Sequence, residues 1–293
     1  MYMMNNSQYS SDSLYTNTNK FIIVVDSRNG TLYKNGAFNS DITFEFEQPI
    51  VVPRQALKLT CSVMAFTAPN SIYTINENNN YLRIIYNSTL LQVYIPYGNY
   101  NSTTFMSVFL STIQGMDITL YTGLGITLNA NTNKFTITHN VYGIQFMNTS
   151  TISSLIGMVA GTTIGSSTIG AFSMTMPYTC NFTGIQNINI HIGNMNTDNV
   201  DSLTKSNTNI IQTVPVDANQ SQIIFNKTTD YAFTVKENVI DLLEIVLTDD
   251  LGNLINFNNQ HWNMTLYFSL VEDIERFKHE KSFQHILKTG YST

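Results

Sequence analysis

The sequence is poor in charge. Only 12% of its 293 residues are Asp, Glu, Lys or Arg, which is about half of the usual quarter. Asparagine alone is more frequent than all charged residues together. A neutral polar surface can be covered by a partner without removing many ions from water, which is costly for each ion. This composition favours a protein that works inside an assembly, although an AT-rich genome would produce the same abundance of Asn.

The chain also lacks an electrostatic footprint for nucleic acid. Its net charge is −6, whereas phosphate neutralisation needs clustered Lys and Arg. The exception lies in residues 274–293, which carry Arg276, Lys278, Lys281 and Lys288. We expect a solvated or partner-bound tail there, with a weak nucleic-acid or membrane contact as the alternative. No specific nucleic-acid partner is predicted.

Cysteine is scarce, since Cys61 and Cys180 are too few to form a disulfide framework. Within LKLTCSV, Cys61 shares one strand face with apolar neighbours at positions 57, 59 and 63, and within YTCNF, Cys180 shares one with Tyr178 and Phe182. We therefore predict that both cysteines are core residues and that synthesis takes place in a reducing, intracellular compartment.

Long apolar runs are missing as well. No stretch approaches the 18 or so apolar residues of a membrane-spanning helix. Residues 1–20 have neither the basic start nor the apolar run of a secretory leader. We expect no membrane span and no such leader.

Motifs for catalysis and cofactor binding are absent from the pattern. His279 and His285 are six residues apart, which does not place them on one face of a zinc-binding helix. GSSTIGA, residues 165–171, lacks the Lys-Ser/Thr that would follow in a phosphate loop, and no Ser lies in a G-x-S-x-G elbow. We predict no enzymatic activity, no catalytic, metal-ligating or cofactor-binding residues, and no cofactor.

What the sequence does contain is β-strand patterning at both ends of the chain. Short β-branched or alternating apolar segments predict strands at 21–25, 42–47, 56–66, 185–192, 221–226, 231–235, 242–248 and 262–270. In the last of these, Trp262, Met264, Leu266, Phe268 and Leu270 take one face. Repeated strands separated by turns indicate an all-β sandwich.

The middle of the chain differs in character. NSTTFMSVFLSTIQG, residues 101–115, predicts an amphipathic helix that begins behind an Asn101/Ser102 cap and stops at Gly115. Residues 125–139 predict a hairpin, 149–158 one or two helical turns ending near Gly157, and 161–173 a loop.

These patterns divide the chain into five parts. We expect a flexible N-terminal arm at 1–18, a first β-rich part at 19–67 and an inserted smaller domain, mixed α/β or β-rich, at 68–178. The second β-rich part follows at 179–273, and a basic tail at 274–293.

The stretch from Leu242 to Leu270 combines two acidic residues, several Asn and the single Trp. A calcium loop that begins at Asp249 would place apolar residues where oxygen ligands belong, so the metal interpretation fails on spacing. Asp249 to Asn253 instead has the residues of a turn, after which Ile255 and Phe257 resume the apolar face. We predict three consecutive strands, with hairpin turns between them.

Tyrosines at positions 94, 97 and 100 surround the segment VYIPYGNY. Aromatic rings can stack on sugars, but they also pack as core residues. We favour packing of Tyr94, Tyr97 and Tyr100 against the adjacent helix and keep an aromatic sugar platform as the alternative.

Four segments, taken in order, resemble the penton and minor capsid proteins of virophages, Polinton-like elements and large DNA viruses. They are LKLTCSVMAFTAPNSIYTINENNNYLRI, IPYGNYNSTTFMSVFLSTI, MPYTCNFTGIQNINIHI and IVLTDDLGNLINFNNQHWNMTLYFSLVE. The resemblance spans residues 40–272. It implies an all-β fold, a single jelly-roll β-sandwich whose strands run roughly perpendicular to the capsid surface, with the inserted domain outermost.

The same resemblance implies a structural role in the virion. Five copies would close the icosahedral vertex as a homopentamer that contacts major capsid proteins and possibly other minor capsid proteins, after synthesis in the host cytoplasm. The N-terminal arm and the tail, with Phe277, Phe283, Ile286 and Leu287 as anchors, would contact neighbours. The alternative function is a host-attachment or carbohydrate-binding β-sandwich module of a virion.

Overall fold

The computed structural model describes residues 20–32, 38–52, 56–166, 168–193, 200–201, 203, 206–227, 232–235 and 237–272. The predicted arm at 1–18 and tail at 274–293, with their basic, apolar and histidine residues, lie outside these described residues. Contacts divide the chain into two compact units: unit 1 comprises Met1–Ser71 and Gln186–Thr293, and unit 2 comprises Ile72–Ile185.

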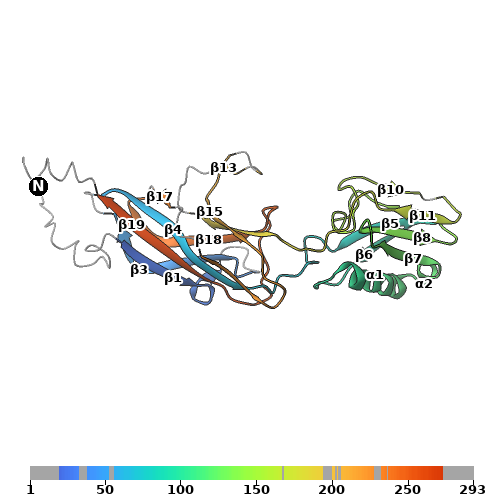
Figure 1. The fold of residues 1–293 in the computed structure, drawn as a ribbon, viewed down its shortest axis with the longest axis horizontal. Coiled ribbons are helices and arrows are strands. Elements are labelled where there is room, and N and C mark those ends of the chain that lie inside the picture. Colours follow the sequence, from blue (N-terminus) through green and yellow to red (C-terminus); the bar gives the residue numbers. More distant parts are fainter. Residues whose placement is uncertain are drawn as a thin grey trace, which may run out of the picture. The chain divides into compact units, whose positions relative to one another are not determined.

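Unit 1 contains two five-stranded antiparallel sheets (Figure 1). Sheet A has the order β1 (Lys20–Asp26), β19 (Asn263–Glu272), β4 (Ala56–Pro69) and β16 (Ile223–Lys227), and β17 (Phe233–Val235) also pairs with β4. Sheet B has the order β15 (Ile210–Pro215), β12 (Asn187–Ile192), β18 (Val239–Thr248), β3 (Asp41–Val51) and β2 (Thr31–Leu32). A 3-10 turn, η1 (Ser27–Asn29), follows β1, and β13 (Val200–Asp201) pairs with β14 (Ser206–Asn207).

The strand pairing of unit 1 is nested. The outermost strands β1 and β19 pair with each other, then β3 with β18, β4 with β16, and innermost β12 with β15. Successive strands of this nest change between sheet A and sheet B, except that the innermost pair, β12 and β15, stays within sheet B. This is the path of an eight-stranded jelly roll. The prediction of an all-β fold with a single jelly roll is therefore confirmed. Unit 2 enters the chain between β4 and β12.

Alternating side chains build the core of unit 1 from these strands. On β1, Phe21, Ile23 and Val25 are buried while the residues between them face outward. Phe21 stacks on Phe268 of β19, with ring centroids 5.0 Å apart. Each large side chain that is fully buried contributes about 1.5–3 kcal/mol through its removal from water. The period of two thus fixes which face of each strand points inward.

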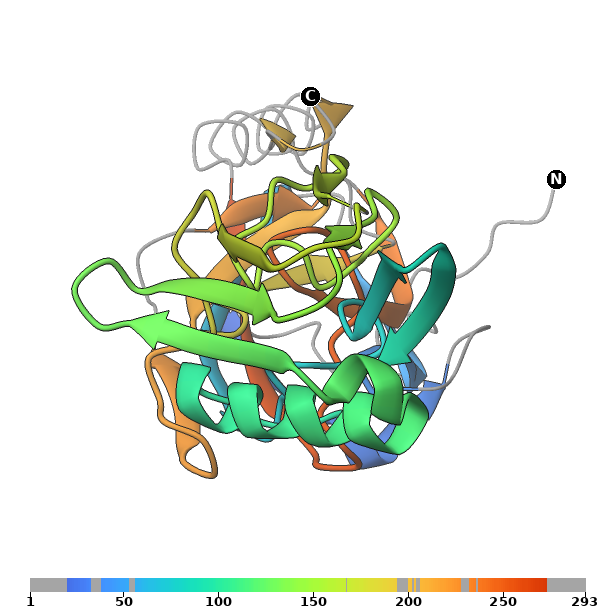
Figure 2. The same ribbon diagram turned by 90° about the vertical axis from the view of Figure 1, so that its right-hand side faces the viewer.

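Unit 2 has its own two sheets and two helices. One sheet has the order β10 (Ile164–Gly165), β9 (Ile144–Phe146), β5 (Tyr81–Tyr86), β6 (Thr89–Tyr94); the other has β11 (Phe172–Thr175), β8 (Lys134–His139), β7 (Leu124–Asn129). The helices are α1 (Ser102–Met116) and α2 (Ile118–Tyr121). Figure 2 shows α1 lying alongside the β7-β8 hairpin. The predicted hairpin at 125–139 is confirmed by the β7-β8 register.

Helix α1 forms where the sequence predicts it. Asn101 and Thr104 make a reciprocal capping box, in which the Thr104 amide donates to Asn101 Oδ1 at 2.9 Å and the Asn101 amide donates to Thr104 Oγ1 at 2.9 Å. Phe105, Phe109 and Ile113 recur every four residues and are all buried. The helix ends at Met116, one residue beyond the predicted stop at Gly115.

Two local predictions in unit 2 need correction. Residues 151–157 form turns rather than a helix, and the loop predicted at 161–173 contains the short strand β10 and the start of β11. Gly157 has a φ of 81°, and a Cβ there would lie 2.2 Å from the Tyr178 carbonyl oxygen. The chain therefore turns where the backbone of Tyr178 and Thr179, in the segment after β11, passes close, which a local helical pattern does not reveal.

The predicted run of hairpins from Leu242 to Leu270 is wrong. β18 belongs to sheet B and β19 to sheet A, so the connection between them crosses from one sheet to the other. The turn at Asp249 is present, but Ile255 and Phe257 do not continue as a strand. Both side chains are buried, with exposures of 3% and 0%, and they belong to the connection that follows β18 and precedes β19. The face that joins Trp262, Met264, Leu266 and Phe268 is buried as predicted, whereas Leu270 is half-buried.

Candidate functional site

The acidic turn between β18 and β19 organises the backbone. Asp249 Oδ1 accepts from the amides of Leu251 and Asn253, both at 2.8 Å, and its Oδ2 accepts from the Asn253 side chain at 3.0 Å. Gly252 occupies the position with φ of 83° that the turn requires. The oxygens that suggested a calcium loop are thus bound to the turn itself.

Asp250 connects this turn to the start of β12. Its Oδ2 accepts from the amides of Gln186 and Asn187, both at 3.2 Å, and its Oδ1 accepts from Asn187 Nδ2 at 2.8 Å. The carboxylate therefore holds the first residues that follow unit 2. Within the described part of the chain, no group of three or more His, Cys, Asp and Glu side chains is placed to hold a metal ion.

A cavity of about 700 Å³ opens at this end of the jelly roll. One wall comes from residues between β1 and β3, with Ser27 and Arg28 after β1 and Phe38 after β2. The other wall comes from residues 256–261, which lead into β19. The two walls are more than 200 positions apart in the chain, and sequence reasoning did not find this site. The only local signals were the Asn258-Asn259 pair and the adjacent His261.

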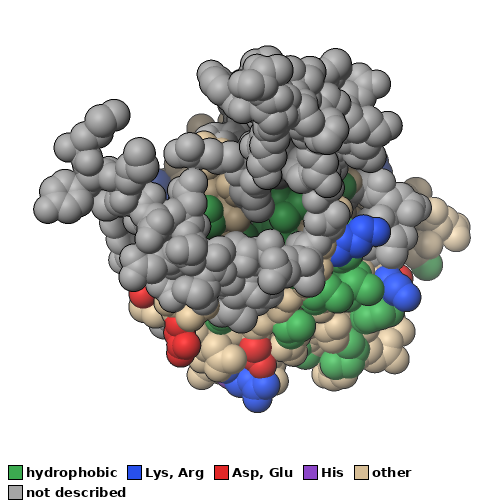
Figure 3. Space-filling model, turned by 90° about the vertical axis from the view of Figure 1, so that its left-hand side faces the viewer, with side chains coloured by type: hydrophobic (Ala, Val, Ile, Leu, Met, Phe, Trp, Pro, Cys, Tyr) green, Lys and Arg blue, Asp and Glu red, His purple; other side chains and the backbone are tan. Residues whose placement is uncertain are grey.

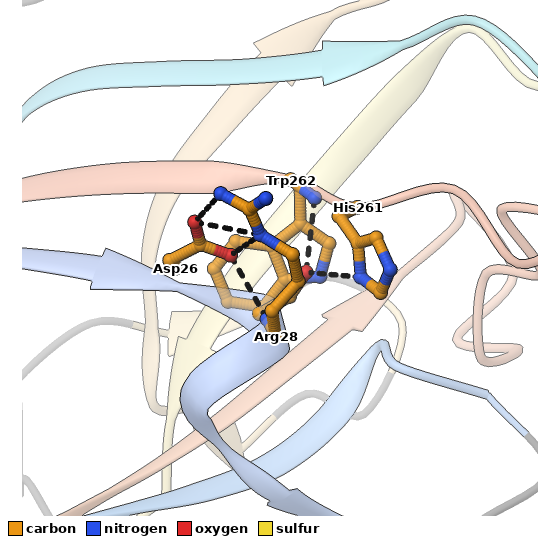
Figure 4. A network of polar contacts seen from close by, with 5 residues as sticks. Asp26, Arg28, His261 and Trp262 are labelled. Atoms are coloured by element: carbon orange, nitrogen blue, oxygen red, sulfur yellow. Dashed lines mark hydrogen bonds and ion pairs between the residues drawn. The ribbon is translucent and has the colours of Figure 1, made fainter.

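Figure 4 shows the polar network behind this cavity. Ser27 Oγ accepts from the Trp262 amide at 3.0 Å and lies 3.4 Å from His261 Nδ1. The Ser27 amide in turn donates to the Trp262 carbonyl at 3.0 Å. The buried indole of Trp262 donates from Nε1 to the Asn39 carbonyl at 2.8 Å. Trp262 therefore ties the two walls together.

One ion pair lies at the edge of the network. Arg28 Nε donates to both carboxylate oxygens of Asp26, at 2.9 and 3.0 Å, and Arg28 Nη2 donates to Oδ2 at 2.5 Å. Side-chain and backbone hydrogen bonds from Arg28 lower the pKa of Asp26 from 3.8 to about 2. The side-chain hydrogen bonds to Asp26 and the charge of its carboxylate raise the pKa of Arg28. The guanidinium charge is thus neutralised beside the cavity.

The outer face of sheet A forms a second candidate surface. Four apolar side chains point away from the core here: Ile22 and Val24 on β1, and Ile223 and Phe225 on β16. Between them, the cross-strand positions are neutral, as in the pairs Ile22–Tyr267, Val24–Thr265 and Phe225–Thr67. Among the described residues, charged side chains on this face lie near strand ends, at Lys20, Asp26, Lys58 and Lys227.

Val24 and Phe225 are 65% and 59% exposed, so most of each side chain is accessible to a partner. In the end view of Figure 3, hydrophobic side chains gather on one side of the surface with isolated basic and acidic side chains around them. The exposed apolar side chains lie on β1 and β16, at the two edges of this face, with neutral side chains of β19 and β4 between them, and the whole face is a candidate contact surface.

Tyr94, Tyr97 and Tyr100 of unit 2 differ in exposure, which bears on whether they pack in the core or form an accessible aromatic surface. Tyr94 and Tyr97 are more than half exposed, whereas Tyr100 is half-buried against the core and donates to the Pro96 carbonyl at 2.9 Å. Tyr94 lies against Tyr81, with ring centroids 5.0 Å apart and planes tilted by 38°. Packing explains Tyr100, and it leaves the Tyr94 and Tyr97 rings accessible.

Unit 2 buries two polar groups that serve its own structure. His139 Nδ1 accepts from the amides of Val141 and Tyr142, at 3.1 and 3.0 Å, and its Nε2 lies 3.0 Å from the Leu120 carbonyl. The Tyr86 hydroxyl donates to Asp117. Burial and this hydrogen bond raise the pKa of Tyr86. Each of these groups joins separate elements of the unit, and each is satisfied.

Both cysteines are buried and unpaired, as predicted for core residues. Burial raises the pKa of each thiol, and that of Cys61 most strongly. A thiol held protonated in this way is a poor nucleophile. In the described residues, no helix has the length and apolar character that crossing a bilayer would require.

The fold defines the class of protein: unit 1 is a single jelly roll that carries unit 2 between its third and fourth strands. No protein-family model matches the chain, and no curated protein matches it. Among solved structures, the mavirus penton protein is similar with a TM-score of 0.43 and 12% identity, covering 86% of this chain and 99% of that one. A chain of the Sputnik virophage is similar with a TM-score of 0.40 and 14% identity, covering 86% and 97%.

Proposed function

We propose that this protein is a non-enzymatic structural component of an icosahedral virus capsid and that it forms the pentameric vertex. The observation that carries the proposal is the outer face of sheet A. It is broad, neutral and partly apolar, and its charges lie at strand ends. Such a face can be buried against a neighbour with little cost from desolvated ions.

The jelly-roll fold suits a structural role in a capsid. Eight-stranded jelly rolls are used in viral capsid and lectin domains, and the first of these uses agrees with the resemblance of the four sequence segments to capsid proteins. A fivefold ring uses heterologous contacts, which close only when each subunit is rotated by the same fixed angle. Two sheets that share one core keep such an angle constant.

The proposal assigns roles to the rest of the chain. The two β-rich parts, 19–67 and 179–273, form the ring, and the insert, 68–178, is its outward part. The arm at 1–18 and the tail at 274–293 contact neighbours, which include major capsid proteins and possibly other minor capsid proteins. Synthesis takes place in the host cytoplasm, and the mature location is the virion.

The oligomeric mass of the purified protein tests the proposal. We expect a species of five times the 33.0 kDa chain mass by native mass spectrometry, populated more at higher protein concentration. Val24→Lys and Phe225→Lys place charges on the face and should shift the species towards monomer. Leu251→Lys is the matched control, because Leu251 is 74% exposed on the turn after β18 and not on this face.

A dimer or trimer as the main assembled species would contradict the fivefold arrangement. If Val24→Lys and Phe225→Lys assembled as well as Leu251→Lys, the outer face of sheet A would not be the contact. Deletion of 274–293 should weaken incorporation into vertices while the jelly roll stays folded, and unimpaired incorporation would remove the tail from the proposal.

A further inference from the structure

The cavity beside Trp262 has a lining that differs from the rest of the jelly roll. Four of its nine lining residues are asparagines: Asn39, which comes before β3, and Asn256, Asn258 and Asn259, which come before His261. Each carboxamide offers both an acceptor oxygen and two N–H donors. A hydroxyl group also donates and accepts, so a ligand with many hydroxyls can satisfy such a lining, whereas an apolar ligand would leave the amides unpaired at a cost.

The charge of the cavity excludes a strongly anionic ligand. Arg28 is the one lining residue with a permanent charge, and its guanidinium is held by Asp26 through three hydrogen bonds. Recognition of a carboxylate or phosphate normally uses an unpaired Arg fork or several basic groups. His261 is the other titratable lining residue, and it is exposed. The lining is therefore close to neutral.

The cavity also offers an apolar wall. Phe38 is half-buried at its edge and is the aromatic residue of the lining. The face of an aromatic ring is a favourable surface for the C–H groups of a sugar, because the ring carries a negative face and excludes water. The asparagine amides can bind the hydroxyl groups of a pyranose, and the Phe38 ring can pack against its C–H groups.

The walls are held in place before any ligand binds. Asn258 Nδ2 donates to the Ser71 carbonyl at 2.5 Å, and Asn256 Oδ1 accepts from the Asn258 amide at 2.8 Å. Asn39 Nδ2 donates to the Gln260 carbonyl. Among the described residues, the Asn39 and Asn258 side-chain oxygens and the Asn256 side-chain N–H groups have no hydrogen-bond partner, so a ligand can supply one. A pre-ordered site loses less entropy on binding.

Asn259 stands apart from its neighbours. It is exposed, and its side chain makes no hydrogen bond with any other described residue. Asn258 and Asn259 both have positive φ, at 51° and 62°, which places them at the tip of the turn. The position favours Gly or Asn, and Asn is the one that brings a carboxamide to the cavity.

We propose that this cavity binds a neutral saccharide of one to three residues. Its volume of about 700 Å³ lies in the range of small-ligand sites. The site is on unit 1, distinct from the accessible tyrosines of unit 2, and it does not depend on the vertex function proposed above. A host-surface glycan and a free oligosaccharide share the chemistry of the ligand.

The test uses the full chain and an array of neutral and sialylated oligosaccharides, followed by calorimetric titration with the methyl glycoside of any sugar bound. We expect saturable binding of a neutral sugar by the wild type. Asn259→Gly removes the carboxamide and keeps the backbone conformation, so it should weaken binding at least tenfold. Phe38→Leu removes the ring and should have an effect of similar size.

The matched control is Ser221→Gly. Ser221 is also exposed on unit 1 with a positive φ, of 64°, and does not line the cavity. The Ser221→Gly variant should bind the sugar with the affinity of the wild type. Thermal unfolding of all variants shows whether each is folded. Binding of an immobilised glycan but not of the methyl glycoside indicates recognition of the longer surface glycan at the same site.

Three results would overturn the inference. The first is the absence of binding to any neutral sugar on the array and in titrations to millimolar concentration. The second is a preference for sialylated over neutral sugars. The third is binding that survives Asn259→Gly and Phe38→Leu but is lost in Tyr94→Ala, which would place the sugar on unit 2. None of these results changes the oligomeric mass, so the vertex proposal is tested separately.

Discussion

Asp26 and Arg28 form a residue-scale pair whose strength a titration can measure. The pKa of Asp26 is lowered to about 2 by hydrogen bonds from Arg28, so the ionised pair stabilises the folded state at pH values above the unfolded pKa of 3.8. That stabilisation is lost as the pH falls from about 4 to about 2. Since the Arg28 side chain is 64% exposed, water and salt screen the pair, and we expect its contribution to the stability of the fold to be small.

Carbon-13 NMR of the Asp26 carboxyl group checks this prediction. Arg28→Gln should return the titration midpoint towards 3.8, and Lys227→Gln, which removes a cation elsewhere on sheet A, should leave it near 2. A midpoint that stays near 2 in Arg28→Gln would show that another group holds the carboxylate.

At this scale, the sequence predicts which residues are buried better than which residues form a site. Cys61 and Phe268 were assigned to the core because strand alternation depends on adjacent positions. The cavity could not be found in this way, because Ser27 and His261 come together only through the pairing of β1 with β19. No local pattern contains that pairing.

At the scale of elements, the N-terminus of α1 offers a measurable contribution. Asn101 Oδ1 accepts from the Thr104 amide, one of the helical N–H groups that has no partner within the helix. Asn101→Ala should lower the free energy of unfolding of unit 2 by about 0.5–2 kcal/mol, and Asn101→Asp should lower it much less. Urea denaturation followed by circular dichroism measures both.

The control for the cap is Asn131→Ala, which changes an exposed Asn in the β7-β8 turn whose side chain caps nothing in α1. It should change stability by less than the cap variant. Equal losses in Asn101→Ala and Asn101→Asp would contradict the capping role and point to packing at that position.

The sequence predicts elements with strong local signals well, but it does not predict which other elements they pair with. Helix α1 has its cap at Asn101 and its apolar period within Ser102–Met116, so the sequence specifies it locally, although it ends one residue beyond Gly115. The segment from β18 to β19 also has strong turn signals, yet whether two strands join one sheet or two depends on contacts with β3 and β4. Helix α2 spans only four residues, Ile118–Tyr121, which is too short for a periodic pattern.

At the scale of the whole molecule, the two units have separate cores. The core of unit 2 is formed by residues between Ile75 and Cys180, including the packed rings of Phe105, Phe109 and Phe135. Unit 1 has its own core around Trp262, Phe66 and Phe268. Since domains with their own core can fold by themselves, we expect residues 72–185 to fold when expressed alone.

Two matched variants of the full chain test this independence. Phe109→Ala and Phe268→Ala each remove a buried ring, at 1% and 0% exposure, from one of the two cores, and each should cost about 3–5 kcal/mol. Hydrogen exchange should show that Phe109→Ala lowers protection in unit 2 alone and Phe268→Ala in unit 1 alone. The isolated segment 72–185 should then keep the protection pattern that unit 2 has in the full chain, because each described strand of unit 2 pairs with another strand of the same unit. Loss of protection across both units in either variant would mean that the two cores unfold as one, and the jelly roll would then depend on its insert for stability.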